Sequence, residues 1–84
     1  MSPFFEPPEL LIVQHNAQGM PISFKWRDQV HTVTLVSNHW RDDGHLRQIR
    51  FKRDYFKVTT DTWLLVHIYH DLLDGKWYIE ESFQ

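Results

Sequence analysis

Residues 21–37, PISFKWRDQVHTVTLVS, carry the clearest structural signal in this chain of 84 residues. Phe24 and Trp26 alternate with polar or charged residues, which is the two-residue period of a half-buried strand. A turn at Asp28-Gln29 lets the second half of the segment return as the next strand, with Trp26 facing His31. Aromatic and β-branched side chains then meet across the two strands, where such pairs stabilise a sheet. The stretch therefore predicts a β-hairpin.

A second hairpin signal lies in NHWRDDGH, residues 38–45. Asp43 and Gly44 both tolerate the positive φ that a type I′ turn requires, so this pair is the strongest turn signal in the chain. Pairing outward from it places Trp40 opposite Arg47. The segment therefore predicts the tip of a hairpin that carries surface charge.

Two changes in the alternation of apolar residues predict bends. The core-facing positions change from odd to even numbers near residues 37–38, which predicts a bulge, and change again near residues 52–54, which predicts a kink. A turn near residues 60–61 then sets Val58 against Trp63. Bends of this kind let a short sheet curl and close on itself.

Together these signals predict an all-β fold. We expect a strongly bent antiparallel sheet of about six strands that forms a small SH3-like barrel, because closure removes exposed strand edges. After a turn at residues 74–75, its last strand places Trp77 and Ile79 inward. Residues 9–84 form this single domain, and residues 1–8, with three prolines, are predicted to be a mobile tail. Phe4 and Phe5 suit either docking into a partner or folding back onto the barrel, and we favour the second.

The composition indicates the cellular location of the protein and its relation to membranes. The chain has no cysteine, so it offers no disulfide and no thiolate metal site, and a reducing cytoplasm is its natural location. The longest apolar run, LLIV, is far shorter than the roughly 20 residues that span a bilayer, and no signal-peptide pattern precedes it. We therefore expect a soluble cytoplasmic protein without a membrane partner.

The sequence gives little support for a catalytic site or a metal-binding site. His39 and His45 approach each other across the predicted hairpin, but a zinc site needs three or four convergent ligands. His67 and His70 lie three apart on a strand and point to opposite faces. Neither a G-x-S-x-G motif nor a glycine-rich phosphate loop occurs. We therefore expect a non-enzymatic protein with no catalytic residue, no metal and no cofactor.

Basic and aromatic residues alternate in the middle of the chain. Residues 21–60 hold eight Lys or Arg against four Asp, whereas residues 61–84 hold one Lys against five Asp or Glu. Rings that stack on bases, beside cations that meet phosphates, are typical of single-stranded nucleic-acid sites. The alternative is that the tryptophans belong to the core and RQIRFKRD is only a solvated strand face. The candidate binding residues are Arg27, Trp40, Arg41, Arg47, Arg50, Arg53, Tyr55 and Lys57.

The order of several motifs adds a resemblance. PISFKWRDQVHTV, then Trp40-Arg41, RDYFKVTT, IYHD and KWYI, resemble a small bacterial domain family of unknown function over about residues 10–80. Its members stand alone or accompany error-prone, Y-family-like DNA polymerases. The chain has Asp28-Gln29 where the family often has a Gly-Arg turn, which weakens the basic patch beside Arg27. The matching residues are Pro21, Phe24, Trp26, Arg27, Val33, Trp40, Arg41, Arg53, Tyr55, Phe56, Val58, Tyr69, Asp71, Trp77 and Ile79.

The resemblance implies a setting in DNA repair or translesion replication, and it implies no catalytic residue. The first hypothesis is an accessory module that binds single-stranded DNA, with Trp40 or Tyr55 as the stacking platform. The alternative is a protein–protein adaptor that docks a polymerase or another subunit without contacting nucleic acid. Only nucleic-acid binding should weaken steeply with salt, because it releases counterions. The residues leave the oligomeric state open.

Overall fold

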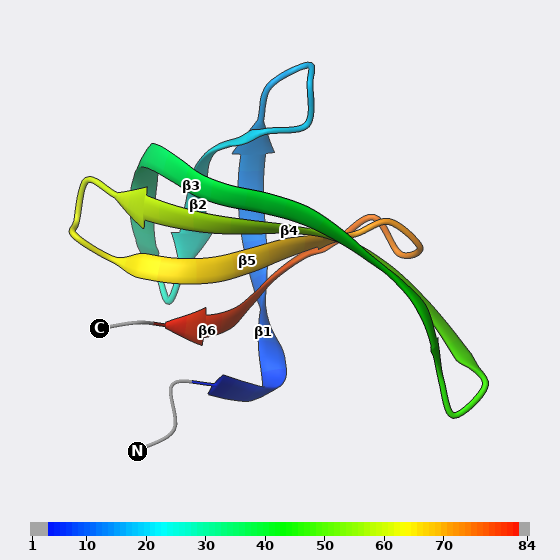
Figure 1. Ribbon diagram of the computed structural model, residues 1–84. Helices are drawn as coiled ribbons and strands as arrows, with labels where there is room; N and C mark the ends of the chain where they lie inside the picture. Colours follow the sequence, from blue (N-terminus) through cyan, green and yellow to red (C-terminus); the bar gives the residue numbers. More distant parts are fainter. Residues whose placement is uncertain (1–3, 83–84) are drawn as a thin grey trace.

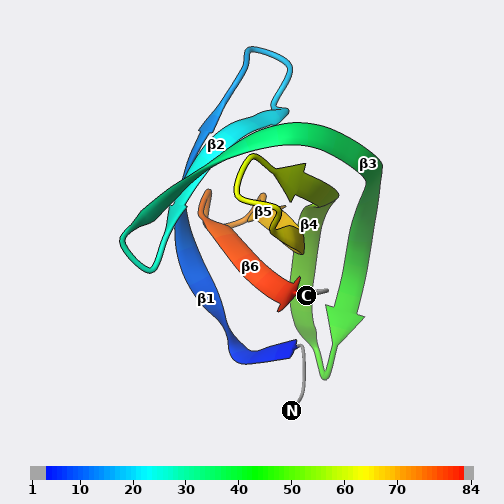
Figure 2. The same cartoon turned by 90° about the vertical axis from the view of Figure 1, so that its left-hand side faces the viewer.

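The computed structural model describes the backbone of residues 4–82 and the side chains of residues 7–80. Each strand pairs antiparallel with the next, and the last pairs with the first, so the sheet closes into a ring (Figures 1 and 2). This confirms the predicted all-β, strongly bent sheet of six strands. No helix able to cross a membrane occurs among the described residues. The strands are β1 (Phe4–His15), β2 (Pro21–Trp26), β3 (Gln29–Leu46), β4 (Ile49–Thr60), β5 (Leu65–Asp71) and β6 (Trp77–Ser82).

The β2–β3 hairpin forms, but its turn is one residue earlier than predicted. Arg27 and Asp28 adopt φ values of 50° and 61°, which is the type I′ conformation whose twist matches that of the flanking strands. Trp26 consequently pairs with Gln29 instead of His31. The predicted register is wrong by two residues, and because two residues is the period of a strand, the inward and outward faces are unchanged.

The predicted turn at Asp43-Gly44 is wrong. The β3–β4 turn lies at Arg47-Gln48, where φ is 51° and 67°, and Gly44 pairs with Phe51 inside the ladder. A Cβ at Gly44 would lie 3.3 Å from Cζ of Phe51. Glycine at this position therefore gives room to an aromatic ring across the strand, and β3 extends to 18 residues.

One of the two predicted bends is present. Register shifts occur in β3 between Val33 and Leu35 and between Val36 and Asn38, so the bulge expected near residues 37–38 is confirmed. The kink expected at residues 52–54 is wrong, because pairing with β3 runs without a shift through this part of β4. The parity of the apolar residues changes there because both faces of β4 bear aromatic residues. Phe51 and Tyr55 lie on the outer face, and Phe56 lies on the inner face in the core.

The interior of the ring holds the hydrophobic core. Phe56 and Ile68, which pair across β4 and β5, are both fully buried. Trp77 and Ile79 of β6 are 5% and 0% exposed, which confirms their predicted inward position. The core cluster consists of Leu11, Phe24, Phe56, Val58, Leu64, Val66, Ile68, Trp77 and Ile79.

Trp63 is not a core strand residue. The sequence predicts it opposite Val58, but Val58 pairs with Val66, and the turn expected at residues 60–61 is a longer loop that includes Trp63. Its φ is 64° and its side chain is 82% exposed. Positive φ is uncommon for a bulky residue. The apolar run beginning at Trp63 suggested a strand by composition, whereas the ladder starts only at Leu65.

Strand β1 begins at Phe4, inside the segment 1–8 for which the sequence predicts a mobile tail. Its pairing with β6 is interrupted between Phe4 and Glu9, where two consecutive prolines have no N–H to donate. Residues 1–3 and the side chains of Phe4 and Phe5 lie outside the described part of the chain. The folding back of the two rings therefore stays a prediction.

A chain of buried hydroxyl groups ties β3 to the β4–β5 loop. The backbone N–H of Leu64 donates to Oγ1 of Thr60 at 3.2 Å, and the hydroxyl oxygens of Thr60 and Thr62 lie 2.8 Å apart. Oγ1 of Thr62 is 2.6 Å from Nδ1 of His31, which is only 4% exposed. Thr62 is thus the side chain that links the buried imidazole to the loop.

Replacing Thr62 with valine is expected to destabilise the domain by about 1–3 kcal/mol, because Nδ1 of His31 then stays buried without a partner. Urea denaturation measures the change in the free energy of unfolding. Thr34→Val is a matched control, since that hydroxyl bonds a carbonyl at an exposed position, and it should change stability by less than about 0.5 kcal/mol. Equal effects of the two substitutions would contradict a structural role for the buried chain.

Candidate nucleic-acid interface

The β3–β4 hairpin continues beyond the rest of the sheet. Pairing between β4 and β5 ends at Arg53 and Asp71, whereas β3 and β4 stay paired as far as Leu46 and Ile49. Residues 43–52, called the arm from here on, therefore form a two-stranded ribbon. Figures 1 and 2 show this ribbon leaving the ring of strands.

The two faces of the arm differ in chemistry. Leu46 pairs with Ile49 and Gly44 pairs with Phe51, so these residues share one face. The intervening pairs, His45 with Arg50 and Asp43 with Lys52, lie on the opposite face because side chains alternate along a strand. The arm is consequently apolar on one face and mainly basic on the other.

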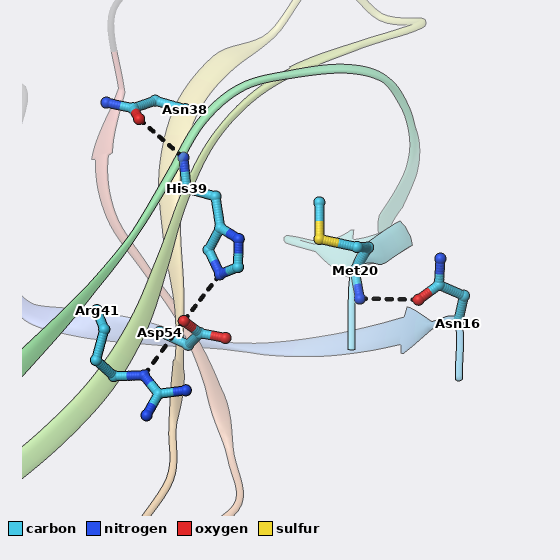
Figure 3. A network of polar contacts seen from close by, with 6 residues as sticks. All are labelled: Asn16, Met20, Asn38, His39, Arg41 and Asp54. Atoms are coloured by element: carbon cyan, nitrogen blue, oxygen red, sulfur yellow. Dashed lines mark hydrogen bonds and ion pairs between the residues drawn. The ribbon is translucent and has the colours of Figure 1, made fainter. Parts of the chain in front are cut away.

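Two of the candidate arginines are bound to carboxylates of the domain. Arg27 in the β2–β3 turn lies 2.7 Å from Glu9, and this hydrogen bond raises the pKa of Arg27. Arg41 lies 3.4 Å from Asp54, whose carboxylate also accepts a hydrogen bond from His39 at 2.9 Å (Figure 3). These guanidinium groups therefore have protein partners already.

Arg53 is held between aromatic rings. Its guanidinium carbon lies 4.7 Å from the ring centre of Tyr69 and 5.5 Å from that of Phe51. Nη1 of Arg53 donates to the Tyr55 hydroxyl at 3.2 Å, and this hydroxyl donates to Glu80 at 3.3 Å. The guanidinium of Arg53 is thus already engaged by cation–π contacts and a hydrogen bond within the domain.

A row of four rings crosses the outer face of the sheet. Trp40, Tyr55, Tyr69 and Tyr78 come from β3, β4, β5 and β6, and neighbouring ring centres are 5.1–5.2 Å apart. Trp40 is parallel to Tyr55 within 3°. Burial raises the pKa of Tyr69 to about 12 and also raises that of Tyr55. Tyr55 is only 6% exposed, so the half-buried Trp40 is the better platform for a base.

The remaining two arginines have no such partner among residues 7–80. Arg47 lies in the turn of the arm and Arg50 follows it, and both are exposed. Neither forms an ion pair with a residue that the structure describes. Lys52, half-buried on the same face as Arg50, adds a third cation, whereas Asp43 is the only carboxylate of the arm.

The structure thus divides the eight predicted residues. Trp40, Arg53, Tyr55 and Lys57 share the outer face, because Lys57 is two residues beyond Tyr55 on β4. Arg41 and Arg50 lie on the opposite face, Arg47 occupies the turn, and Arg27 lies in another hairpin. Sequence reasoning missed Tyr69 and Tyr78 as members of the aromatic row and Leu46 and Ile49 as an exposed pair. For Tyr69, the sequence signal was the lack of a polar face along residues 63–69.

Metal ligation has no geometric basis among residues 7–80. No group of three His, Asp or Glu side chains in this part of the chain is arranged to hold an ion. His39 instead stacks on Phe56, with ring centres 4.3 Å apart, and bonds Asp54.

Comparison with known proteins places the chain in a family. The model of DUF6504, described as a domain of unknown function, matches residues 8–81. The chain belongs to the DUF6504 family. Searches of curated proteins and of solved structures gave no match. The arm and the aromatic row of this chain both lie within the matched residues. The small uncharacterised domain that the motifs suggested is therefore confirmed.

Proposed function

We propose that this DUF6504 domain is a non-enzymatic accessory module that binds single-stranded nucleic acid through its arm, in the setting of DNA repair or translesion synthesis. One observation carries the proposal. Of the five arginines of the chain, Arg27, Arg41 and Arg53 are engaged by the domain, whereas Arg47 and Arg50 project on the arm. A protruding ribbon with cations left over for a ligand suits a polyanion.

The outer face supports the same proposal. Trp40 lies on β3 at the base of the arm, next to Lys57 and in the aromatic row. Stacking of a base on an aromatic ring contributes about 1–3 kcal/mol and tolerates any sequence. Arg50 and Lys52 lie on the face of the ribbon opposite Trp40. A strand that meets these cations and also lays a base against Trp40 would therefore cross the edge of the ribbon. No chemical step is needed for this role.

The proposal predicts a steep salt dependence. Three arm cations that replace counterions on a single strand give a slope of about −2 in log K against log salt. The affinity for a fluorescently labelled oligothymidylate should therefore fall about 20-fold between 50 and 200 mM salt, as measured by fluorescence anisotropy. Arg47→Ala with Arg50→Ala removes two of the three cations, so the fall should shrink to about threefold.

A matched control separates the arm from the overall charge. Lys25→Ala with Lys76→Ala also removes two cations, from β2 and from the β5–β6 loop. This variant should keep the salt dependence of the unchanged protein. Identical salt slopes for the two double variants would contradict binding through the arm, and absence of binding at 50 mM salt would overturn the proposed function.

A specific surface favours a second candidate function, a protein–protein adaptor. Leu10, Ile12 and Val30 on the outside of β1 and β3 are 58%, 71% and 62% exposed, and Ile12 and Val30 both pair with Lys25 of β2. Neighbouring exposed aliphatic side chains are typical of docking surfaces. Binding of a polymerase subunit there should hardly respond to salt, and it should be lost in Ile12→Ser with Val30→Ser.

A further inference from the structure

The tip of the arm exposes a pair of aliphatic side chains. Leu46 and Ile49 pair directly across the Arg47-Gln48 turn and are 68% and 72% exposed. Both turn residues have positive φ, so a tight two-residue turn holds the pair side by side at the end of the ribbon. Behind the pair, the Phe51 ring rests on Gly44. The tip is therefore a narrow apolar edge.

Two cations lie close to this edge in the ribbon. Arg47 lies in the turn between the two aliphatic residues, and Arg50 lies one residue beyond Ile49 on the opposite face. A ligand that complements the tip needs an apolar surface with anions beside it. Stacked bases with phosphates along the strand have this arrangement, and β-ribbons fit into nucleic-acid grooves.

A lipid surface matches the tip less well. Anionic head groups lie in one plane, so the cations on the face opposite Leu46 and Ile49 would point away from them. Membrane binding also grows with the apolar area inserted, and the tip offers two aliphatic side chains. Cations in the turn and on the opposite face thus favour nucleic acid as the occupant, because its phosphates are not confined to one plane.

We propose that Leu46 and Ile49 form a wedge that enters between two neighbouring bases and opens their stacking. The inference rests on the proposed function, because the arm must first bind the strand. Aliphatic side chains that enter a base step unstack it, and the additional contacts with the opened step offset the cost of unstacking. Arg47 and Arg50 would meet the phosphates on either side of the opened step.

The test uses oligonucleotides that carry one 2-aminopurine, whose fluorescence rises when it loses its stacked neighbours. Single-stranded and duplex probes are titrated with the full chain, so the two sources of a base step are distinguished. We expect fluorescence to rise on binding and the rise to be lost in Leu46→Ser with Ile49→Ser. The affinity of this variant should fall by about tenfold or less, while its salt slope stays unchanged.

Two controls keep the result specific. Leu35→Ser with Leu73→Ser removes exposed aliphatic side chains elsewhere, 57% and 50% exposed, and should keep the fluorescence rise. Thermal unfolding of each variant verifies that the ring of strands is intact. A rise that persists in the Leu46 and Ile49 variant, or is lost equally in the control, overturns the wedge.

The failures of the two proposals can be told apart. Salt-dependent binding without any change in 2-aminopurine fluorescence overturns the wedge and leaves the proposed function standing. Absence of binding to either probe overturns both. Binding of the unchanged protein to vesicles of anionic lipid, lost on substitution of Leu46 and Ile49 and accompanied by no oligonucleotide binding, would assign the tip to a membrane surface instead.

Discussion

Replacing Phe56 with alanine is expected to destabilise the domain by about 3–5 kcal/mol. The side chain is fully buried, stacks on His39 at 4.3 Å and on Trp77 at 5.6 Å, and pairs with Ile68. Its removal leaves a cavity that a closed ring of strands cannot easily fill by collapse. A domain of this length has a total stability of roughly 4–13 kcal/mol, so much of the variant should be unfolded under mild conditions.

Urea denaturation followed by tryptophan fluorescence measures this loss. Phe51→Ala is the matched control, because Phe51 is half-buried and lies on the arm outside the ring. It should cost about 1 kcal/mol, since less apolar area is lost there. Equal losses in the two variants would contradict the assignment of Phe56 to the core and of Phe51 to a separate ribbon.

Alkaline pH is expected to destabilise the domain through Tyr69. Burial raises the pKa of Tyr69 from its ordinary value of 10 to about 12. Between these values the unfolded chain releases the proton and the folded domain keeps it, so the stability is complete below pH 10 and falls as the pH rises toward 12. The loss from this one residue between pH 9 and pH 11.5 is about 2 kcal/mol.

Tyr69→Phe isolates this contribution. The ring and its packing are retained, but there is no proton to release, so the free energy of unfolding of the variant should fall about 2 kcal/mol less over the same pH interval. The difference in tyrosinate absorbance at 295 nm between the unchanged protein and Tyr69→Phe verifies that Tyr69 is protonated at pH 10. A variant with the same pH dependence as the unchanged protein would show that another group causes the alkaline loss.

The inward-facing residues of the ring could be predicted from the sequence alone. Period-two alternation depends on each strand by itself, so the faces of Phe24, Trp77 and Ile79 followed directly from their neighbours. The bulge near residues 37–38 was predictable, but the face of Trp40 was not: two register shifts occur before it, so Trp40 lies on the outer face and not on the core face that a single shift implies. The number of strands followed from the turns between such runs.

The candidate site was predictable only as a set of residue types. Trp40, Arg53, Tyr55 and Lys57 share a face because β3 and β4 pair through Arg41 and Asp54, a register that follows from a turn at Arg47-Gln48. The sequence preferred Asp43-Gly44, where glycine is the stronger local turn signal. The glycine is instead needed opposite a phenylalanine, and a cross-strand contact of this kind is invisible to local patterns.

By itself, therefore, the sequence determined the number of strands, the inward faces of β2 and β6, and the presence of both aromatic and basic residues in the middle of the chain. Only the tertiary structure decided which arginine side chains are available to a ligand. Arg27, Arg41 and Arg53 are engaged by groups distant in sequence or on neighbouring strands. Arg47 and Arg50 extend beyond β5 and form no ion pair with a residue that the structure describes. Alternation is a local property of one strand, but a charge is neutralised by partners that only the closed ring brings together.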